Sequence, residues 1–222
     1  MRARFLDLSH TVEHGLVTYP GLPAPVVSDH LGRAASREQY AEGTEFQIGR
    51  IEMVANTGTY VDAPFHRFAD AADLADLSLE SLADLPGVVV DVPAGARRIG
   101  PAALPQRELR GGAVLFRTGW SRHFGTPQYG EGHPFLSAEL ARELVRRAVA
   151  LVGIDSLNVD DTEDGARPVH TALLAAGIPI VEHLAHLEQL PATGFRFFAV
   201  PVKVRGMGSF PVRAFAQVRA AG

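Results

Sequence analysis

The sequence predicts a single α/β domain with a mixed β-sheet flanked by helices. Apolar runs rich in β-branched residues, typical of buried strands, alternate with helix-like segments through the second half of the chain. Hydrophobic residues make up 46% of the 222 residues and charged residues 21%, which is an ordinary globular composition. No repeat, low-complexity segment or break in composition divides the chain. We therefore expect one domain over residues 1–222, with an extended N-terminal arm at residues 1–25.

The N-terminal quarter contains two strand-like segments with a proline-rich stretch between them. Residues 5–12 have the pattern of a short strand, and residues 46–55 alternate well enough to form another. Residues 20–25 contain three prolines, which favours an extended arm. Residues 32–45 are polar and lack periodicity. Because such an arm does not pack on itself, we expect it to cross the interface of a homodimer or higher homo-oligomer.

The remainder of the chain alternates helices and strands. Ser78 is expected to cap a short helix that turns Leu79, Leu82 and Leu85 inward and ends at Pro86. The expected helix therefore lies directly before residues 88–92, the run of the chain richest in β-branched residues.

Two longer helices follow. Ser137 begins a helix with one apolar stripe, and residues 169–176 form another that closes at Gly177. Strands are expected at residues 88–92, 113–118, 151–155, 178–182, 196–204 and 212–218.

The composition excludes several classes of function. A net charge of −4 argues against nucleic acid or an anionic membrane as the main partner, and a small-molecule ligand is expected instead. The absence of cysteine excludes disulfides, thiolate catalysis and zinc–cysteine sites, so any metal must rest on His, Asp and Glu. No apolar run approaches the ~20 residues of a membrane span, and the start of the chain lacks the apolar segment of a signal peptide. A cytoplasmic protein is expected.

Residues 56–66 hold the densest group of candidate functional residues. Asp62 and His66 lie one helical turn apart in sequence. If Asp62 caps a short helix, both side chains face one small volume that suits a divalent cation. Taken alone the pair is weak, because a capping Asp and an ordinary surface His give the same pattern.

Several polar residues end apolar strands or open helices, and in α/β folds such positions commonly gather at one rim. They are Asp62, Asp155, His170 and Glu182. Glu182 has an alternative as the ion-pair partner of Arg205 or Arg213. His170 has an alternative as a helix-capping residue. The residues by themselves leave both readings open.

Blocks of sequence along nearly the whole chain occur in an order that matches one known family. They are Asp7-Leu8-Ser9-His10, Tyr19-Pro20-Gly21, Thr57-Gly58-Thr59 with Asp62-Ala63-Pro64 and His66, Arg117-Thr118-Gly119-Trp120, His133-Pro134-Phe135-Leu136-Ser137, Val152-Gly153-Ile154-Asp155, His170 with Glu182, and Gly208-Ser209-Phe210-Pro211-Val212-Arg213-Ala214. In these blocks the chain resembles the cyclase family of metal-dependent hydrolases, which includes bacterial kynurenine formamidases and isatin hydrolase. The central family motif reads His-x-Gly-Thr-His-x-Asp-x-Pro-x-His. The resemblance implies the swivelling β/β/α fold of that family.

Carried over residue by residue, the resemblance implies roles for four residues of this chain. Asp62 would be a metal ligand, bridging two ions in two-metal members. His170 and Glu182 would complete the metal shell, and His66 would be the catalytic acid–base. The resemblance also implies a place in tryptophan catabolism like that of the kynurenine formamidases.

The chain departs from the family motif at two metal-ligand positions. Asn56 and Tyr60 stand where the family has histidines. An amide carbonyl is a poor zinc donor, and a phenol binds a metal well only when ionised, against an ordinary pKa near ~10. We therefore expect one divalent metal per chain, zinc or manganese, with the other position lost.

The preferred hypothesis is a hydrolase of a small cyclic or aryl amide or ester. The metal would activate water, His66 would transfer the proton, and Tyr60 would donate a hydrogen bond to the developing oxyanion. The residues expected to bind substrate are Asn56, Thr59, Phe65, Trp120 and Tyr19.

Two other classes remain open from the sequence. One is a metal-free cyclase or dehydratase on the same fold, with Tyr60 and His66 as an acid–base pair. The other is a non-catalytic ligand-binding relative, because losing two ligands is also how an active site decays.

Overall fold

A nine-stranded mixed sheet forms the centre of the computed structural model, which describes residues 3–219. The strands β5, β7, β9 and β10 are parallel to one another, and the remaining pairs are antiparallel. In spatial order the strands are β1 (Ala3–Asp7), β13 (Phe215–Arg219), β11 (Thr193–Phe198), β5 (Leu85–Asp91), β7 (Ala113–Arg117), β9 (Leu151–Ile154), β10 (Ile180–Glu182), β4 (Tyr60–Asp62) and β12 (Ser209–Pro211). The predicted α/β class with a mixed sheet is confirmed.

Smaller elements surround this sheet. Two further strand pairs are β2 (Val26–Leu31) with β3 (Ile48–Glu52), and β6 (Arg98–Ile99) with β8 (Phe135–Leu136). The α-helices are α1 (Arg33–Ser36), α2 (Ala138–Arg146) and α3 (Pro168–Ala175). The 3-10 turns are η1 (Pro64–His66), η2 (Leu79–Ser81), η3 (Pro101–Ala103), η4 (Trp120–His123), η5 (Pro127–Gly130) and η6 (Leu187–Gln189). None of the helices within residues 3–219 is long and apolar enough to cross a membrane.

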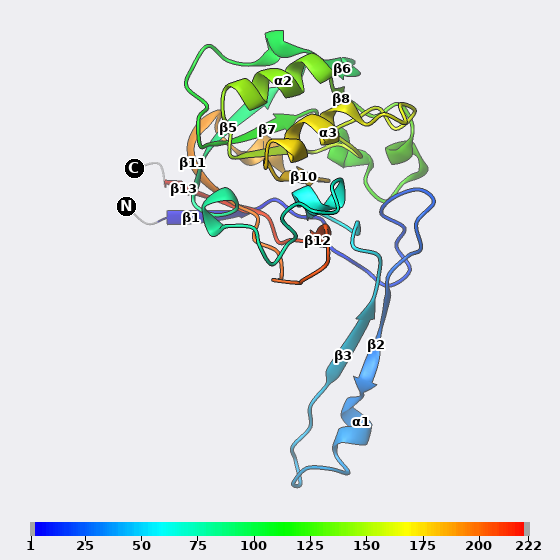
Figure 1. Cartoon of the computed structure of the whole chain (residues 1–222). Helices are drawn as coiled ribbons and strands as arrows, with labels where there is room; N and C mark the ends of the chain where they lie inside the picture. Colours follow the sequence, from blue (N-terminus) through cyan, green and yellow to red (C-terminus); the bar gives the residue numbers. More distant parts are fainter. Residues whose placement is uncertain (1–2, 220–222) are drawn as a thin grey trace.

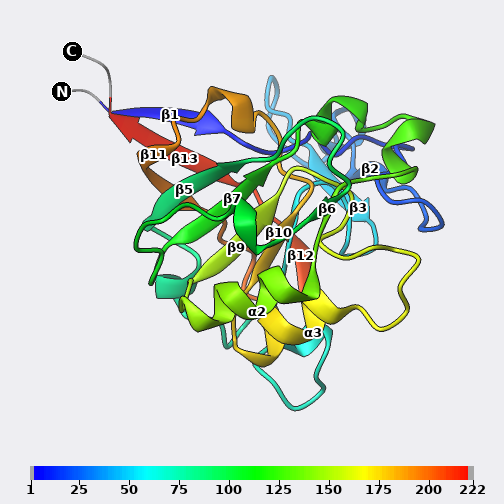
Figure 2. The ribbon, with the colours of Figure 1, turned by 90° about the horizontal axis from the view of Figure 1, so that it is seen from above.

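The parallel strands are buried on both faces, as their continuous β-branched runs predict. On one face α2 and α3 lie side by side and cover the sheet (Figures 1 and 2). Side chains that pack on this face are Val90, Val114, Phe116, Val152, Ile154, Leu140, Leu144, Leu173 and Leu174. Those that pack on the other face include Val89, Leu115, Leu151, Val181, Leu184, Phe195 and Phe197.

The helix predicted after Ser137 forms as α2, and α3 covers residues 168–175, one residue earlier than the predicted 169–176. The Ser137 hydroxyl oxygen accepts a hydrogen bond from the Leu140 amide at 3.2 Å, which caps α2. Gly177 follows α3 with φ of +74°, a conformation that costs glycine little and other residues more.

The prediction of a helix after Ser78 is wrong. Only a single 3-10 turn forms there, Ser78 makes no side-chain cap, and Leu79 is 61% exposed. Pro86 lies inside β5 rather than at a helix end. The reason is the neighbouring Gly87, which has no side chain where the ring of Phe195 packs, so β11 can pair with β5 across it.

Other strand boundaries also differ from the sequence prediction. Residues 199–204 are not part of β11, and residues 212–214 lie outside β13. Asp62 does not cap a helix: it ends β4, and Ala63 precedes η1. The first strand covers residues 3–7 rather than 5–12 and occupies an edge of the main sheet. The expected extended arm is wrong for the segment after β1, because it turns at residues 14–15 and 20–21 and the Gly15 amide donates to the Pro25 carbonyl at 2.9 Å.

The projecting part of the molecule is the hairpin of β2 and β3, and not the proline-rich arm. Figure 1 shows this hairpin extending away from the body. Its exposed apolar side chains are Val26, Val27, Phe46, Ile48 and Ile51, each 46% to 52% exposed. Tyr19 and Leu22 of the arm line a cavity of their own chain instead.

Close backbone contact between Gly208 and η1 fixes the position of His66. A Cβ on Gly208 would lie 2.5 Å from the backbone nitrogen and Cα of His66. The Gly208 carbonyl also accepts a hydrogen bond from the Ala63 amide at 2.7 Å. The contact therefore leaves no room for a side chain at Gly208.

We predict that Gly208→Ala lowers the free energy of unfolding by about 1–3 kcal/mol, because backbone must move to admit the methyl group. Urea denaturation measures this change. Gly100→Ala is the matched control, since a Cβ at Gly100 meets nothing within 4 Å. Equal stability of the two variants would contradict the close contact.

Candidate metal centre and active site

The candidate site is built on the pairing of β4 with β10. These antiparallel strands set Tyr60 opposite Glu182 and Asp62 opposite Ile180. Residues two apart on a strand share a face, and directly opposed residues do too, so the side chains of Tyr60, Asp62 and Glu182 lie on the same side of the sheet. Asp62 and Glu182 are completely buried. Two carboxylates thus lie in the interior, where each needs compensation.

Glu182 is surrounded by hydrogen-bond donors. The Tyr60 hydroxyl donates to its Oε2 at 2.5 Å, and the Val159 amide donates to its Oε1 at 2.6 Å. The Asn158 amide adds a longer contact of 3.4 Å to Oε2.

The ion-pair alternative for Glu182 is excluded. Arg205 pairs with Asp76 and Arg213 pairs with Asp7, both on the surface. Glu182 therefore belongs to the buried cluster.

One carboxylate oxygen of Asp62 has a hydrogen-bond partner and the other has none. Its Oδ1 accepts a hydrogen bond from the Ser209 hydroxyl at 2.5 Å, whereas Oδ2 is buried without a hydrogen-bond partner. The nearest cationic or imidazole atom is Nε2 of His170, 3.6 Å from Oδ2. A buried carboxylate oxygen with no donor is costly unless a cation or proton compensates it.

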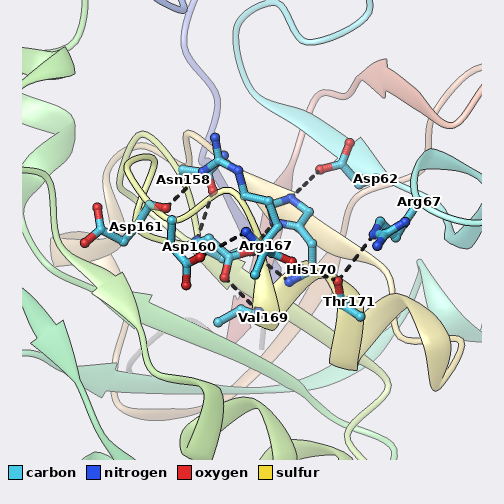
Figure 3. Close-up of polar contacts among 12 residues, drawn as sticks. Asp62, Arg67, Asn158, Asp160, Asp161, Arg167, Val169, His170 and Thr171 are labelled. Atoms are coloured by element: carbon cyan, nitrogen blue, oxygen red, sulfur yellow. Dashed lines mark hydrogen bonds and ion pairs between the residues drawn. The ribbon is translucent and has the colours of Figure 1, made fainter.

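His170 is held by a residue that the sequence analysis missed. Its Nδ1 lies 2.7 Å from Oδ2 of Asp160, and Figure 3 shows this carboxylate beside the start of α3. Asp160 also accepts hydrogen bonds from the backbone amides of Val169 and His170. Asp160, and not His170, therefore caps the helix, and its carboxylate fixes the imidazole so that Nε2 faces Asp62 and Glu182.

His66 is the more accessible of the two imidazoles. Its Nδ1 lies 2.9 Å from the Ser209 hydroxyl, and its side chain is 38% exposed. Because that hydroxyl donates its hydrogen to Asp62, its oxygen accepts the Nδ1 proton of His66. Nε2 of His66 is then unprotonated and free to accept a proton or bind a cation.

The electrostatics of the cluster favour a positive charge between the carboxylates. Burial alone would lower the pKa of His170, but hydrogen bonds to Asp160 and Asp62 and the charge of Glu182 raise it to about 10. Burial raises the pKa of Glu182 to about 7 although His170 opposes the shift. Burial opposes the lowering of the Asp62 pKa, yet hydrogen bonds and the nearby imidazoles keep it below its usual value. These shifts favour one positive charge between the carboxylates, either on the His170 imidazole or on a metal ion that replaces its Nε2 proton.

The donor set fits one divalent metal. Asp62, His66 and His170 each offer a ligand atom, and these atoms lie within 4.8 Å of one another. Glu182 is not part of that group, but its Oε1 lies 3.7 Å from Nε2 of His170. Tyr60 does not provide an anionic ligand, because burial and the charge of Glu182 raise the pKa of its phenol well above the usual value.

A cavity of about 210 Å³ opens onto this cluster. It is lined by Tyr19, Leu22, Asn56, Tyr60, His66, Arg67, Asn158, Arg167, His170 and Glu182. A larger cavity of about 690 Å³ lies around residues of β5, β11 and the loop 107–112, but no histidine lines it. The smaller cavity is therefore the one lined by the candidate metal-binding and catalytic residues.

Comparison with known proteins agrees with this arrangement of residues. Residues 6–161 match the family model described as "Putative cyclase". The chain belongs to the cyclase family.

Relatives within the cyclase family span almost the whole chain. A kynurenine formamidase of Bacillus cytotoxicus is 30% identical over 213 residues, which is 96% of each protein, and one of Bacillus cereus is 28% identical over the same share. Among solved structures, isatin hydrolase A from Labrenzia aggregata bound to benzyl benzoate superimposes with a TM-score of 0.82 at 24% identity, covering 98% of this chain and 94% of that one. A structure described as a potential metal-dependent hydrolase with cyclase activity has a TM-score of 0.81 at 24% identity, covering 99% and 100%. The structural matches support the fold.

Not all residues predicted for a cyclase-family site reach the cavity. The Thr59 hydroxyl donates to the His183 carbonyl at 2.6 Å, because Thr59 points to the face opposite Tyr60. Trp120 donates to the Tyr129 carbonyl and lines a different cavity. Phe65 lies in η1 and is not part of the cavity wall.

The role predicted for Tyr60 changes as well. Its hydroxyl hydrogen is engaged by Glu182, so it does not serve as an oxyanion donor in this arrangement. Residues that the sequence analysis missed are Arg67, Asn158, Asp160, Arg167 and Ser209. Ser209 stood in a matched sequence block, whereas Arg67 and Arg167 carried no signal beyond their closeness to His66 and His170.

Two further histidines, the half-buried His10 and the buried His183, lie near the site and are held neutral. Burial and the charge of His186 lower the pKa of His10 to about 4, and the His10 ring stacks on Phe124. Burial lowers the pKa of His183 to about 3, although a hydrogen bond to the Leu157 carbonyl opposes the shift. Below pH 6.5 the unfolded chain binds protons that these folded imidazoles do not.

We predict that His10 makes the protein less stable as the pH falls from 6.5 towards 4, with no further loss below about 4. His10→Phe keeps the stacking and removes the titration. When the pH is lowered from 7 to 4.5, the free energy of unfolding of the variant should therefore rise by about 2 kcal/mol relative to that of the native protein. Urea denaturation at both values measures this, and His30→Gln on the exposed hairpin is the control. A difference that does not change with pH would show that His10 titrates normally.

Proposed function

We propose that this chain is a metal-dependent hydrolase that cleaves the C–N bond of a small aryl or cyclic amide or the acyl C–O bond of a related ester. The observation that carries the proposal is the unpartnered Oδ2 of Asp62, which lies with His170 and His66 at the wall of a cavity. The kynurenine formamidases that resemble the chain over 96% of its length support an aryl formamide as the substrate.

The proposed cofactor is one divalent ion per chain, zinc or manganese, because both suit a shell of imidazole and carboxylate. Asp62 and His170 would hold it, with Glu182 nearby. His66 belongs to the same group of potential ligand atoms, but we assign it to proton transfer because it is the more exposed of the two imidazoles. When bound, such an ion supplies Lewis-acid activation of the substrate carbonyl and of water.

His66 is proposed as the group that moves the proton. Nε2 of His66 accepts a proton from the attacking water as the water oxygen bonds to the carbonyl carbon. The same atom returns that proton to the amine nitrogen when the C–N bond breaks. Ser209 keeps the ring in place by accepting from Nδ1 and donating to Asp62.

Tyr60 has a positioning role in this proposal. Its hydroxyl donates to Glu182 and takes the place of an imidazole beside it. A metal-free cyclase that uses Tyr60 as an acid is less well supported, because that proton is already shared with a buried carboxylate. The cytoplasmic location and the place in tryptophan catabolism stay predictions.

We predict that His66→Ala lowers turnover of a formanilide-type amide by about 10²–10⁴-fold while the metal content stays the same. Turnover and metal content are measured on the same purified sample. His123→Ala, outside the cavity, is the control and should retain both. Loss of the metal together with activity would show that His66 is a ligand and would overturn the division of roles.

We also propose that the chain forms a homodimer or higher homo-oligomer through the hairpin of β2 and β3. An isolated two-stranded hairpin is marginally stable in water, and this one exposes several apolar side chains. Burying them against a second copy would stabilise the hairpin.

The hairpin contact predicts that the native protein is at least a dimer in light scattering at micromolar concentration. Replacing both Ile48 and Ile51 by lysine should produce monomers, because the charges would have to be buried in the interface. Leu79→Lys, exposed on η2, is the control and should not change the mass. A monomeric native protein would contradict the proposal.

A further inference from the structure

Two arginines form part of the cavity wall at positions where the proposed reaction requires no cation. Arg67 follows η1 directly after His66, and Arg167 comes directly before Pro168 at the start of α3. Figure 3 shows both side chains beside His170, together with Asn158 and Thr171. Each arginine therefore approaches the cavity from an element that also carries an imidazole of the site.

In the part of the chain that the structure describes, neither guanidinium forms an ion pair. Among residues 3–219, neither has a carboxylate within 4.0 Å. Arg67 donates from Nε to the Thr171 hydroxyl at 3.3 Å, and Arg167 donates from Nη1 to the Asp161 carbonyl at 3.1 Å. These neutral acceptors orient the two side chains and leave most of their donors unused. Other arginines are paired with carboxylates, including Arg117, Arg146, Arg196, Arg205 and Arg213.

The carboxylates nearest to the cavity offset this charge only in part. Asp160 is engaged by His170 and two backbone amides, and Glu182 by Tyr60 and Val159. A divalent ion would balance Asp62 and Glu182, which leaves the negative charge of Asp160. Together with the two arginines, the cavity then carries one net positive charge, and neither guanidinium is paired with a carboxylate of the described residues.

The backbone at Arg167 is strained to place this side chain. Its φ is +47° and its ψ is 58°, a left-handed conformation that is unfavourable for a residue with a Cβ. Glycine would take this conformation without that cost. Strain of this kind concentrates at ligand-binding positions.

We propose that the substrate carries a carboxylate, which Arg167 and Arg67 bind while its amide faces His66 and His170. A guanidinium presents paired N–H donors that match the two oxygens of a carboxylate. The cavity of about 210 Å³ restricts the substrate to a small molecule. This inference rests on the proposed amide hydrolysis and adds the class of substrate: a small aryl or cyclic amide with an acidic group.

Binding tests the proposal independently of catalysis. Calorimetric titration of the metal-loaded protein compares 3-aminobenzoate and 4-aminobenzoate with aniline, which lacks the carboxylate. At least one acid should bind about 10-fold or more tightly than aniline, since a hydrogen bond to a charged group contributes about 1.5–3 kcal/mol. Arg167→Gln and Arg67→Gln should each reduce that affinity about 10-fold. Arg142→Gln, an exposed residue of α2, makes the same change in net charge and should leave the affinity unaltered.

Hydrolysis gives the second comparison, between formanilide and 3- or 4-formamidobenzoate. Arg167→Gln and Arg67→Gln should each lower kcat/KM for the acidic amide at least 10-fold more than for formanilide, mainly by raising KM. Arg167→Gly should show the same loss while unfolding at a urea concentration no lower than that of Arg167→Gln, because glycine relieves the strained backbone.

Equal binding of the acids and aniline, or variants that bind the acids as well as the native protein, would overturn the carboxylate proposal. If neither amide is hydrolysed but the acids bind through the arginines, the proposed reaction fails and the carboxylate site stands. The two failures are therefore distinguishable.

Discussion

Two buried carboxylates on neighbouring strands are the constraint around which this site is arranged. Asp62 and Glu182 have no exposed surface, and burying a charge without compensation is expensive. Glu182 is stabilised by donors, chiefly the Tyr60 hydroxyl and the Val159 amide. Asp62 keeps one oxygen without a donor, and His170 lies next to it. A metal ion bound between Asp62 and His170 would supply the positive charge that this carboxylate oxygen lacks.

The departures from the family motif follow from the same constraint. Tyr60 occupies an imidazole position but provides a neutral hydroxyl that satisfies Glu182, so the chain exchanges a metal ligand for a hydrogen-bond donor. Asn56 lines the cavity and lies beside the Tyr60 phenol. We propose that one metal position is thereby replaced by hydrogen-bonded side chains, and that the other keeps Asp62 and His170.

Much of the fold and the centre of the site could be predicted from the sequence. Buried strands were recognised by their β-branched runs, and the resemblance to the cyclase family assigned Asp62, His66, His170 and Glu182 to one site. The failures came from tertiary contacts that no local pattern encodes. Thr59 would have been placed correctly had residues 60–62 been recognised as a strand, since its neighbour Tyr60 must face the other way. Asp160 and Arg167 could not be found, because their roles depend on how the loop before α3 folds back onto His170.

Metal content per chain tests the central claim most directly. Purified native protein reconstituted with zinc or manganese, and analysed by elemental mass spectrometry after removal of free metal, should retain one ion per chain. Replacing Asn56 and Tyr60 together by histidine should raise the content to two, because two imidazoles would then stand beside Asp62. Two ions in the native protein would show that Asn56 or Tyr60 ligates after all. No ion under any loading condition would contradict the metal-dependent account.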